Sequence, residues 1–379
     1  MPEIVDLELL GSGAPPPGGA RVVARLDGIP VGVVRHAESV DAVLDAVQDE
    51  LCVALAARRL RGEDEPARHD VTVVVCTRDR PQLLDGCLAA LSLQHRAPSE
   101  IVVVDNASAG DETRRVAERW GARCVVEPAP GLDRARNTGL AEARTELVAF
   151  TDDDARPEPG WLGALVEPFA APDVHAVTGL VLPAELRTPA QVLFEDVYGG
   201  MGKGLRLRVH TERMRRAYVR PERVGVGCNM AFRRAALLRL GGFDTALDVG
   251  TRTGGGGDLD VFERFLEGTA GVVYVPGAVV RHLHRAEMDG LRRQLFDNGR
   301  GYGAMLAAAY IRGDRARRRA VLRRSASWLV NWQAARLARS MVGRGGLPPR
   351  LVAAEVAGAP LGPSLYLAER ASQAGDERR

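Results

Sequence analysis

The sequence is poor in cysteine, in aromatic residues and in lysine. Its five cysteines show no CxxC spacing and lie mostly in apolar stretches, so we expect buried, reduced thiols rather than a disulfide framework or a thiol metal motif. Aromatic residues make up 5% of the 379 residues, and Lys203 is the one lysine among 51 basic residues. The abundance of arginine favours bidentate contacts with phosphate and carboxylate groups.

The sequence also lacks an excess of charge and a long apolar run. Basic and acidic residues number 51 and 49, and the net charge is +2. No global field therefore marks a nucleic-acid binder, and we expect no nucleic-acid partner. No uncharged apolar stretch reaches 18 residues, and the start, MPEIVDLELL, lacks the regions of a signal peptide. We expect a cytoplasmic globular protein.

The chain divides into four expected segments. Near the start, β-like runs at 21–26 and 31–34 joined by Asp27-Gly28 predict a hairpin, and a helical pattern follows at about 40–61. We expect a small β-hairpin and helix module over residues 1–68, a catalytic domain over 69–310, an Arg-rich helical extension over 311–370 and a disordered tail over 371–379.

From Val71 onward, short apolar strands alternate with amphipathic helices. The strand-like runs are VTVVVC, EIVVVD, ARCVVE and ELVAF. This alternation predicts βαβ units and a mainly parallel sheet, with ligands bound beyond the carboxyl ends of the strands. No GxGxxG or GxxxxGK[ST] loop follows the first strand, so neither the dinucleotide fingerprint nor the P-loop is present.

Three adjacent aspartates, Asp152 to Asp154, follow the strand-like run LVAF. Neighbouring carboxylates repel one another unless a cation is present. Residues two apart share a face in an extended or turn backbone, so Asp152 and Asp154 are expected to act together while Asp153 points elsewhere. Hard oxygen ligands suit Mg²⁺ or Mn²⁺ bridging a diphosphate. An acidic turn or helix cap is the structural alternative.

The order of these motifs resembles the family 2 glycosyltransferases. The motifs are CTRDRP, VVVDNAS, GLDRARNTGL, FTDDDA, GCNMAFRR, GGFD and GGGGDLDVF, and the resemblance covers roughly Asp70 to Ala309. It implies a GT-A fold, in which a Rossmann-like, mixed and mainly parallel sheet is flanked by helices. It also implies inverting transfer of a sugar from a nucleoside-diphosphate sugar donor to an acceptor hydroxyl.

The resemblance assigns donor contacts residue by residue. Asp105 would hydrogen-bond the nucleobase, and because a carboxylate accepts from an imide N–H, a UDP-sugar is favoured. Asp152 would contact the ribose or a metal-bound water. The expected nucleotide-sugar-binding residues are Thr77, Arg80, Asp105, Arg136, Asp152, Asp153 and Asn229. The alternatives are surface ion pairs for the two arginines and local backbone hydrogen bonds for Asn229.

The resemblance also implies a divalent metal, Mn²⁺ or Mg²⁺, ligated by Asp154. A later histidine often completes such a site, and the segment VVRHLHR offers His282 and His284. Strand alternation puts both imidazoles on one side, so periodicity does not choose between them. The position in the family motif favours His282.

The general base implied by the resemblance is Asp258, in GGGGDLD, with Asp260 as the less favoured choice. The family usually has Glu-Asp here, and this chain has Gly257 in place of the glutamate. A carboxylate at a helix N-terminus is also stabilised by the helix dipole. A helix cap is therefore the alternative role for Asp258.

Beyond about residue 312 the chain is rich in arginine, with apolar residues interleaved. Packing against the catalytic domain is the first expectation; a peripheral contact with the inner face of a membrane and an interaction with another protein or acidic polymer are alternatives. Two rival functions also stand beside the transferase: a nucleotidyltransferase with a related sheet, and a non-catalytic nucleotide-sugar-binding scaffold. The sequence does not name the donor sugar or the hydroxyl acceptor.

Overall fold

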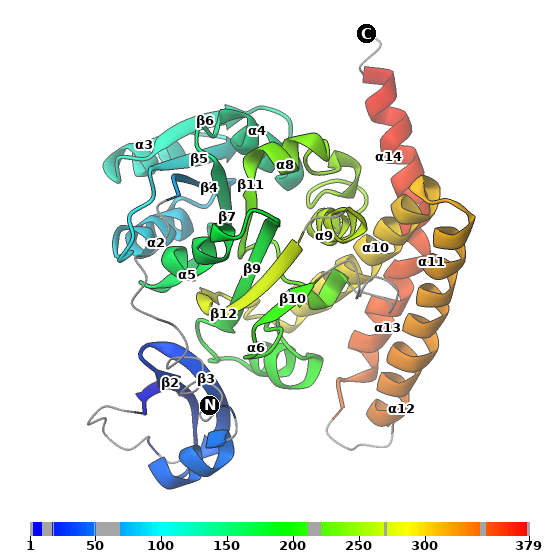
Figure 1. The fold of residues 1–379 in the computed structure, drawn as a ribbon. Coiled ribbons are helices and arrows are strands. Elements are labelled where there is room, and N and C mark those ends of the chain that lie inside the picture. The colour runs from blue at the N-terminus through cyan, green and yellow to red at the C-terminus, as the bar shows by residue number, and fades with distance from the viewer. Residues whose placement is uncertain are drawn as a thin grey trace.

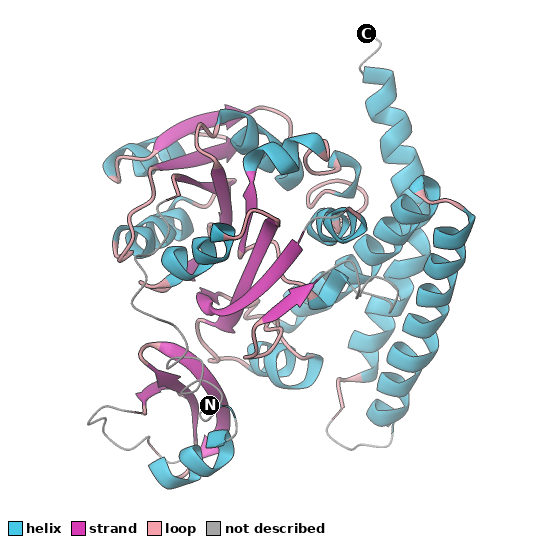
Figure 2. Cartoon of the chain, in the orientation of Figure 1, coloured by secondary structure: helices cyan, strands magenta, loops and turns pink. Residues whose placement is uncertain are grey.

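The computed structural model describes residues 3–9, 17, 19–48, 50, 69–210, 221–268, 271–341 and 346–376. Figure 1 shows a small N-terminal sheet, a larger central sheet flanked by helices, and a group of long helices that leads to the C-terminus. Figure 2 shows that the strands gather in the first two parts, whereas the last part is helical. The α/β class expected from the sequence is confirmed.

The N-terminal part is a three-stranded sheet. Strand β2 (Ala20–Leu26) pairs in parallel with β1 (Ile4–Glu8) and antiparallel with β3 (Ile29–Ala37). Asp27 and Gly28 join β2 to β3 with φ values of 52° and 74°, the positive values that a type I′ hairpin turn requires. The predicted hairpin is confirmed. Residues 40–48 are helical, and most of the remaining predicted helix lies outside the described residues.

The central sheet has nine strands in the order β10-β12-β9-β11-β7-β4-β5-β6, with β8 paired to β12. Its strands are β4 (Val71–Thr77), β5 (Glu100–Asn106), β6 (Arg123–Glu127), β7 (Leu147–Asp152), β8 (Ala155–Pro157), β9 (Val174–Pro183), β10 (Arg208–His210), β11 (Met230–Arg233) and β12 (Gly271–His282). The strands from β7 to β6 are parallel, whereas β11 runs antiparallel to both β7 and β9. The sheet is therefore mixed, as expected.

Helices cover both faces of this sheet. The helices of this part are α2 (Pro81–Ser92), α3 (Glu112–Arg119), α4 (Leu132–Glu142), α5 (Trp161–Val166), α6 (Pro189–Val192), α8 (Arg234–Arg239) and α9 (Gly257–Glu267), with the shorter turns η1 (Glu167–Ala170), η2 (Leu193–Tyr198), η3 (Pro221–Arg223) and η4 (Thr245–Leu247). Val73 and Val75 of β4 pack with α2 and α5, whereas Val74 and Cys76 pack with α4 and α9. This alternation along β4 is that of a strand buried on both faces.

The N-terminal sheet packs on the β8 and β12 side of the central part. Arg25 donates to Asp6 in its own sheet at 2.8 Å and to Glu158 at 2.7 Å. Arg281 of β12 donates to the same two carboxylates at 2.6 and 2.9 Å. Val23 of β2 adds apolar contacts with β9 and β12. The described residues of this module therefore pack against the central sheet.

The C-terminal part is a group of helices built around one long helix. Its elements are α10 (Met288–Arg312), α11 (Arg315–Ser327), η5 (Trp328–Ala334), α12 (Ala335–Met341), α13 (Pro349–Gly358), η6 (Ala359–Leu361) and α14 (Gly362–Asp376). At Gly299 and Gly303 of α10, a Cβ would lie 1.9 Å and 2.1 Å from backbone oxygens of Glu355 and Ala359. Only glycine allows helices to approach so closely.

Arginines of the C-terminal part pair with acids of the central part. Arg324 donates to both carboxylate oxygens of Glu263 at 2.9 and 3.2 Å, and Arg317 pairs with Glu267. This supports the first expectation, packing against the catalytic domain. One described helical segment, Pro349–Ala374, passes a length and composition test for a membrane span with a mean hydropathy of 1.3. The core helix of a soluble protein can have the same length and composition, so this segment alone does not indicate a membrane contact.

The predicted disorder of residues 371–379 is wrong for most of that tail. Helix α14 continues through Asp376. Gln373, within it, accepts a hydrogen bond from Thr245 at 3.1 Å. The polar composition suggested disorder, but the tail continues a helix that is already anchored on the catalytic part.

Candidate functional site

The carboxyl ends of the parallel strands bring the expected donor residues to one edge of the sheet. Thr77, the last residue of β4, is the register partner of Asp105 in β5, and Cys76 is the partner of Asp152 in β7. Thr77 and Asp105 are 4% and 6% exposed. The parallel register therefore places these three strand ends side by side.

The three aspartates after β7 turn to three different partners. Asp153 accepts a hydrogen bond from the Thr77 hydroxyl at 2.7 Å and lies 3.5 Å from Arg80. Asp154 lies 3.0 Å from Nε2 of His282 and 3.8 Å from Arg80, and Asp152 lies 3.5 Å from Arg136. Asp153 thus links β7 to β4, while Asp154 links the turn to β12.

The surroundings of the three aspartates shift their pKa values. Burial and the neighbouring charge of Asp154 raise the pKa of Asp153 to about 6, against the effects of Thr77 and Arg80. Burial also raises the pKa of Asp152, although Arg136 opposes the shift. For Asp154 the effect of burial is outweighed by His282 and Arg80, so its pKa is lowered. Several carboxylates thus lie close together with too little positive charge.

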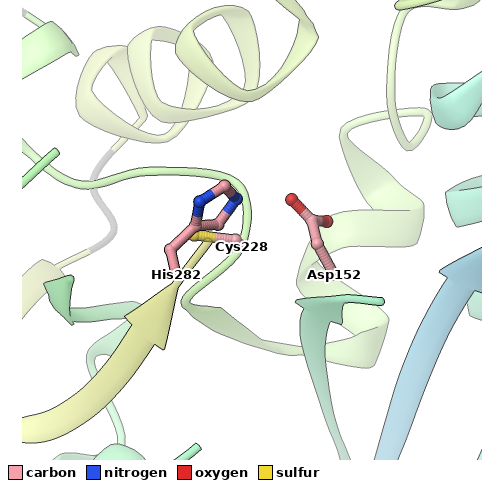
Figure 3. A group of neighbouring side chains, drawn as sticks. All are labelled: Asp152, Cys228 and His282. Carbon is pink, nitrogen blue, oxygen red and sulfur yellow. The ribbon is translucent and has the colours of Figure 1, made fainter. Parts of the chain in front are cut away.

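Asp152, Cys228 and His282 converge from three segments of the chain (Figure 3). One potential ligand atom of each lies within 4.8 Å of the others. Nδ1 of His282 is buried and has no hydrogen-bond partner among the described residues. Burial lowers the pKa of His282, but its hydrogen bond to Asp154 outweighs this, and the pKa is raised overall. A buried imidazole nitrogen without a partner beside crowded carboxylates fits a divalent cation.

A second cluster joins α4 to the start of α9. Arg136, 5% exposed, lies 3.0 Å from Asp133 and 3.5 Å from Asp152. The Asp258 carboxylate accepts from the backbone N–H of Gly227 at 2.9 Å and of Leu259 at 2.8 Å. These two amides hold Asp258 in a fixed orientation. Asp133, Arg136, Asp152 and Asp258 all line one cavity of about 520 Å³.

Gly257 has a steric reason to be glycine. A Cβ at this residue would lie 1.7 Å from Oδ2 of Asp133. Burial raises the pKa of Asp133 well above its usual range, and the charges of Asp248 and Asp258 add to the shift, although Arg136 opposes it. The carboxylate of Asp133 therefore lies beside Asp258, where a side chain at residue 257 would begin.

Residues 72–241 match the family model described as glycosyl transferase family 2. This segment of the chain is therefore similar to family 2 glycosyltransferases. The match covers the expected donor residues from Thr77 to Asn229, and it ends before Asp258 and His282. The mixed sheet described above is the arrangement that the GT-A resemblance led us to expect.

Named relatives of this chain include a pre-mycofactocin glycosyltransferase of Mycobacterium tuberculosis (strain ATCC 25618 / H37Rv), 29% identical over 293 residues. That alignment covers 73% of this chain and 58% of the relative. A glucosyl-dolichyl phosphate glucuronosyltransferase of Haloferax volcanii is 30% identical over 185 residues, which are 46% of this chain and 56% of that protein. The chain thus spans less than two thirds of the length of these relatives.

Among solved structures, glucosyl-3-phosphoglycerate synthase from Mycobacterium tuberculosis in complex with Mn²⁺, UDP and glucosyl-3-phosphoglycerate is similar to this chain. The sequence identity is 18% and the TM-score is 0.42, with 63% of this chain and 78% of that chain covered.

Three expectations from the sequence are corrected by the structure. Nε2 of His284 lies 3.1 Å from Glu195 and its ring packs edge-on against Phe194, whereas Nε2 of His282 lies 3.0 Å from Asp154. Nδ1 of each imidazole is buried without a hydrogen-bond partner among the described residues, and the contact with Asp154 favours His282 as the metal ligand. Asn229 is fully buried and does not line the cavity: it accepts from Trp161 at 2.8 Å and donates to two backbone carbonyls. Its side chain supports the sheet, as in the structural alternative.

The third correction concerns the reserve base. Asp260 is fully buried and pairs with Arg264 at 2.7 Å and with Arg312. It anchors α9 to α10 and cannot reach an acceptor in the cavity.

The sequence reasoning missed two residues of the site, Asp133 and Cys228. Both lie inside quoted motifs, GLDRARNTGL and GCNMAFRR. Burial raises the pKa of the Cys228 thiol well above its ordinary value, and the charges of Asp152 and Asp154 add to this. Cys228 therefore lies in the cluster as a neutral thiol. No signal in these motifs pointed to either residue.

Proposed function

We propose that this family 2 glycosyltransferase transfers a sugar from a nucleoside-diphosphate sugar to an acceptor hydroxyl with inversion at the anomeric carbon. The observation that carries the proposal is the shared cavity, where Asp258, fixed by two backbone amides, lies with Asp152 and Arg136. A general base that shares a cavity with two of the expected donor residues is what a single displacement needs.

The strand ends supply the donor side. Asp105 is nearly buried, and its carboxylate accepts from the backbone of Ser108 at 3.3 Å. A further acceptor position on this carboxylate suits the imide N–H of uracil, which supports a UDP-sugar as donor. Thr77 and Arg80 hold the turn between β7 and β8, and Arg80, 43% exposed at its side chain, is placed to face a phosphate.

Asp154, Asp152 and His282 would hold Mn²⁺ or Mg²⁺. When bound, the cation supplies charge neutralisation for the departing diphosphate. Arg136 contributes a permanent positive charge behind Asp152. The roles of these residues agree with the excess of carboxylates over cations at this edge.

The proton transfer falls to Asp258. Its carboxylate takes the proton of the acceptor hydroxyl as that oxygen bonds to the anomeric carbon. The bond from this carbon to the diphosphate oxygen breaks at the same time, and the nucleoside diphosphate leaves with the electron pair. Asp133, beside Asp258, has a raised pKa and is assigned a positioning role through Arg136. We keep residues 69–310 as the proposed catalytic domain, with α10 shared with the helical extension.

A thermal-shift panel tests the donor part of this proposal. UDP, GDP, dTDP and CDP are added with and without Mn²⁺ to wild type and to Asp154→Ala. Ligands that bind the native state raise its apparent stability. We expect UDP to stabilise the wild type only with metal, and the variant to lose that effect. If no nucleotide shifts the transition, the proposal is wrong.

A further inference from the structure

One end of the site cavity is walled by aromatic side chains. We call Phe194, Tyr198, Tyr302, Trp328 and Trp332 the aromatic wall, and all five line the cavity of about 520 Å³ that also holds Asp258. A volume of several hundred cubic ångströms is that of a small-molecule site. The wall is contributed by η2, α10 and η5, so the C-terminal helices complete the cavity.

The concentration of aromatic residues here is unusual for this chain. Aromatic residues make up only 5% of the sequence, yet two of the four tryptophans belong to the wall. The rings pack in pairs: Phe194 stacks on Tyr198 at 5.3 Å, and Tyr302 lies 5.3 Å from Trp328. The Arg336 guanidinium lies 5.6 Å from the Trp332 ring and 4.6 Å from the Tyr198 ring. Trp332 is still 42% exposed, so part of its apolar surface is left for a ligand. Pre-packed rings of this kind present a rigid flat surface to a ligand.

Several polar groups beside the wall are already engaged with one another, while Gln294 also lines the cavity. Tyr198 donates to Glu355 at 3.0 Å, and Glu355 accepts from Arg336 at 2.7 Å. Asp297 pairs with Arg300 at 2.8 Å. A sugar here would need partners for several hydroxyl groups, and leaving them unpaired is costly. The apolar body of a ligand has no hydrogen bonds to lose in the same contact.

The opposite, polar end lies around Asp258. Lys203, the one lysine of the chain, lines the same cavity. Burial lowers its pKa, and the charges of Asp258 and Glu222 oppose the shift. The cavity thus has a charged end, where a hydroxyl would meet the base, and an apolar end about the aromatic wall.

We propose that the acceptor is a hydroxyl compound with a flat, largely apolar body, which seats on the aromatic wall and directs its hydroxyl to Asp258. This inference rests on the proposed function, because it takes Asp258 as the base. It names the chemical class of the acceptor: a small aromatic alcohol or phenol rather than a sugar chain.

The test compares 2-naphthol with maltose as acceptor probes. Binding of each probe is measured by equilibrium dialysis in the presence of UDP and Mn²⁺, and release of UDP from UDP-glucose is followed in parallel. The proteins are wild type, Trp332→Ala and the control Trp120→Ala, whose indole donates to Asp85 on a distant exposed surface. UDP binding is checked on every protein by thermal shift.

We expect 2-naphthol to bind the wild type and to accelerate UDP release, and maltose to do neither. Loss of one stacking ring should weaken 2-naphthol binding about tenfold in Trp332→Ala, with UDP binding unchanged. Trp120→Ala should behave as wild type. Binding of maltose in preference to 2-naphthol, binding of neither, or an unaltered affinity in Trp332→Ala would overturn the inference. Failure of UDP to bind would instead refute the proposed function.

Discussion

The carboxylate of Asp133, from α4, fills the space that a side chain at Gly257, the first residue of α9, would occupy. A Cβ at residue 257 would lie 1.7 Å from Oδ2 of Asp133. The two residues come from different helices, so a carboxylate is present beside Asp258 although the usual family glutamate is not. The rival scaffold hypothesis depended on that missing glutamate, and this contact removes its main support.

The contact predicts the behaviour of Gly257→Ala. The added methyl group should clash with Asp133 and lower the free energy of unfolding by about 1–3 kcal/mol, the usual cost of overpacking. The φ of Gly257 is not in the left-handed region, so space alone is responsible. Chemical denaturation measures the change. The double variant with Asp133→Gly removes the clashing carboxylate and should recover part of the loss; a fully additive pair would contradict the contact.

Asp258→Asn should abolish most turnover. General base catalysis contributes about 10²–10⁴-fold, so we expect kcat for UDP release to fall by at least about 10²-fold with KM for the donor little changed. The matched control is Asp260→Asn, which breaks a buried ion-pair cluster with Arg264 and Arg312. It should lower the Tm far more than it lowers kcat. Retained turnover in Asp258→Asn would exclude this residue as the base.

Arg136→Met should destabilise the protein. Arg136 is the buried partner of Asp133 and Asp152, and removing one member of a buried ion pair costs about 3–5 kcal/mol. The pKa of Asp133 is already raised by burial, so protonation relieves the unpaired charge at low pH. Denaturation at pH 5 and pH 8 should show the smaller loss at pH 5. Equal losses at both values would contradict a charge origin.

Metal binding should strengthen as the pH rises. The pKa of His282 is raised above 6.5 because its pairing with Asp154 outweighs burial. The stability that this pair contributes without metal is therefore fully present below pH 6.5 and is lost as the pH rises through the raised pKa. A protonated imidazole cannot ligate a metal. Titration of Mn²⁺ by calorimetry should thus give tighter binding at pH 8 than at pH 6, and His282→Ala should flatten this dependence.

The parts of the site that the sequence predicted share one property. Thr77, Asp105 and Asp152 each lie at the carboxyl end of a strand in the parallel part of the sheet, and the alternating pattern of strands and helices is enough to place strand ends side by side. The hairpin at Asp27-Gly28 was likewise predicted from local turn chemistry. A turn motif or a strand pattern determines its local geometry without contacts from distant segments.

The parts that the sequence did not predict depend on contacts between distant segments. Asp133 and Gly257 are far apart along the chain, and nothing in either motif indicates their overlap. The choice between His282 and His284 was decided by Glu195, which engages His284 from η2. Asn229 lies in a family motif, but a hydrogen bond from Trp161 turns its side chain into the core. Such pairings depend on tertiary packing, which the periodicity of the sequence does not predict.

The most direct test of inverting transfer is the anomeric configuration of the sugar that the enzyme first releases. UDP-α-glucose is incubated with enzyme and Mn²⁺, with water as acceptor, and the product is followed by proton NMR before mutarotation. Attack directed by Asp258 from the face opposite the diphosphate predicts β-glucose as the initial product, and Asp258→Asn should release almost none. Initial release of α-glucose by the wild type would contradict the single-displacement mechanism.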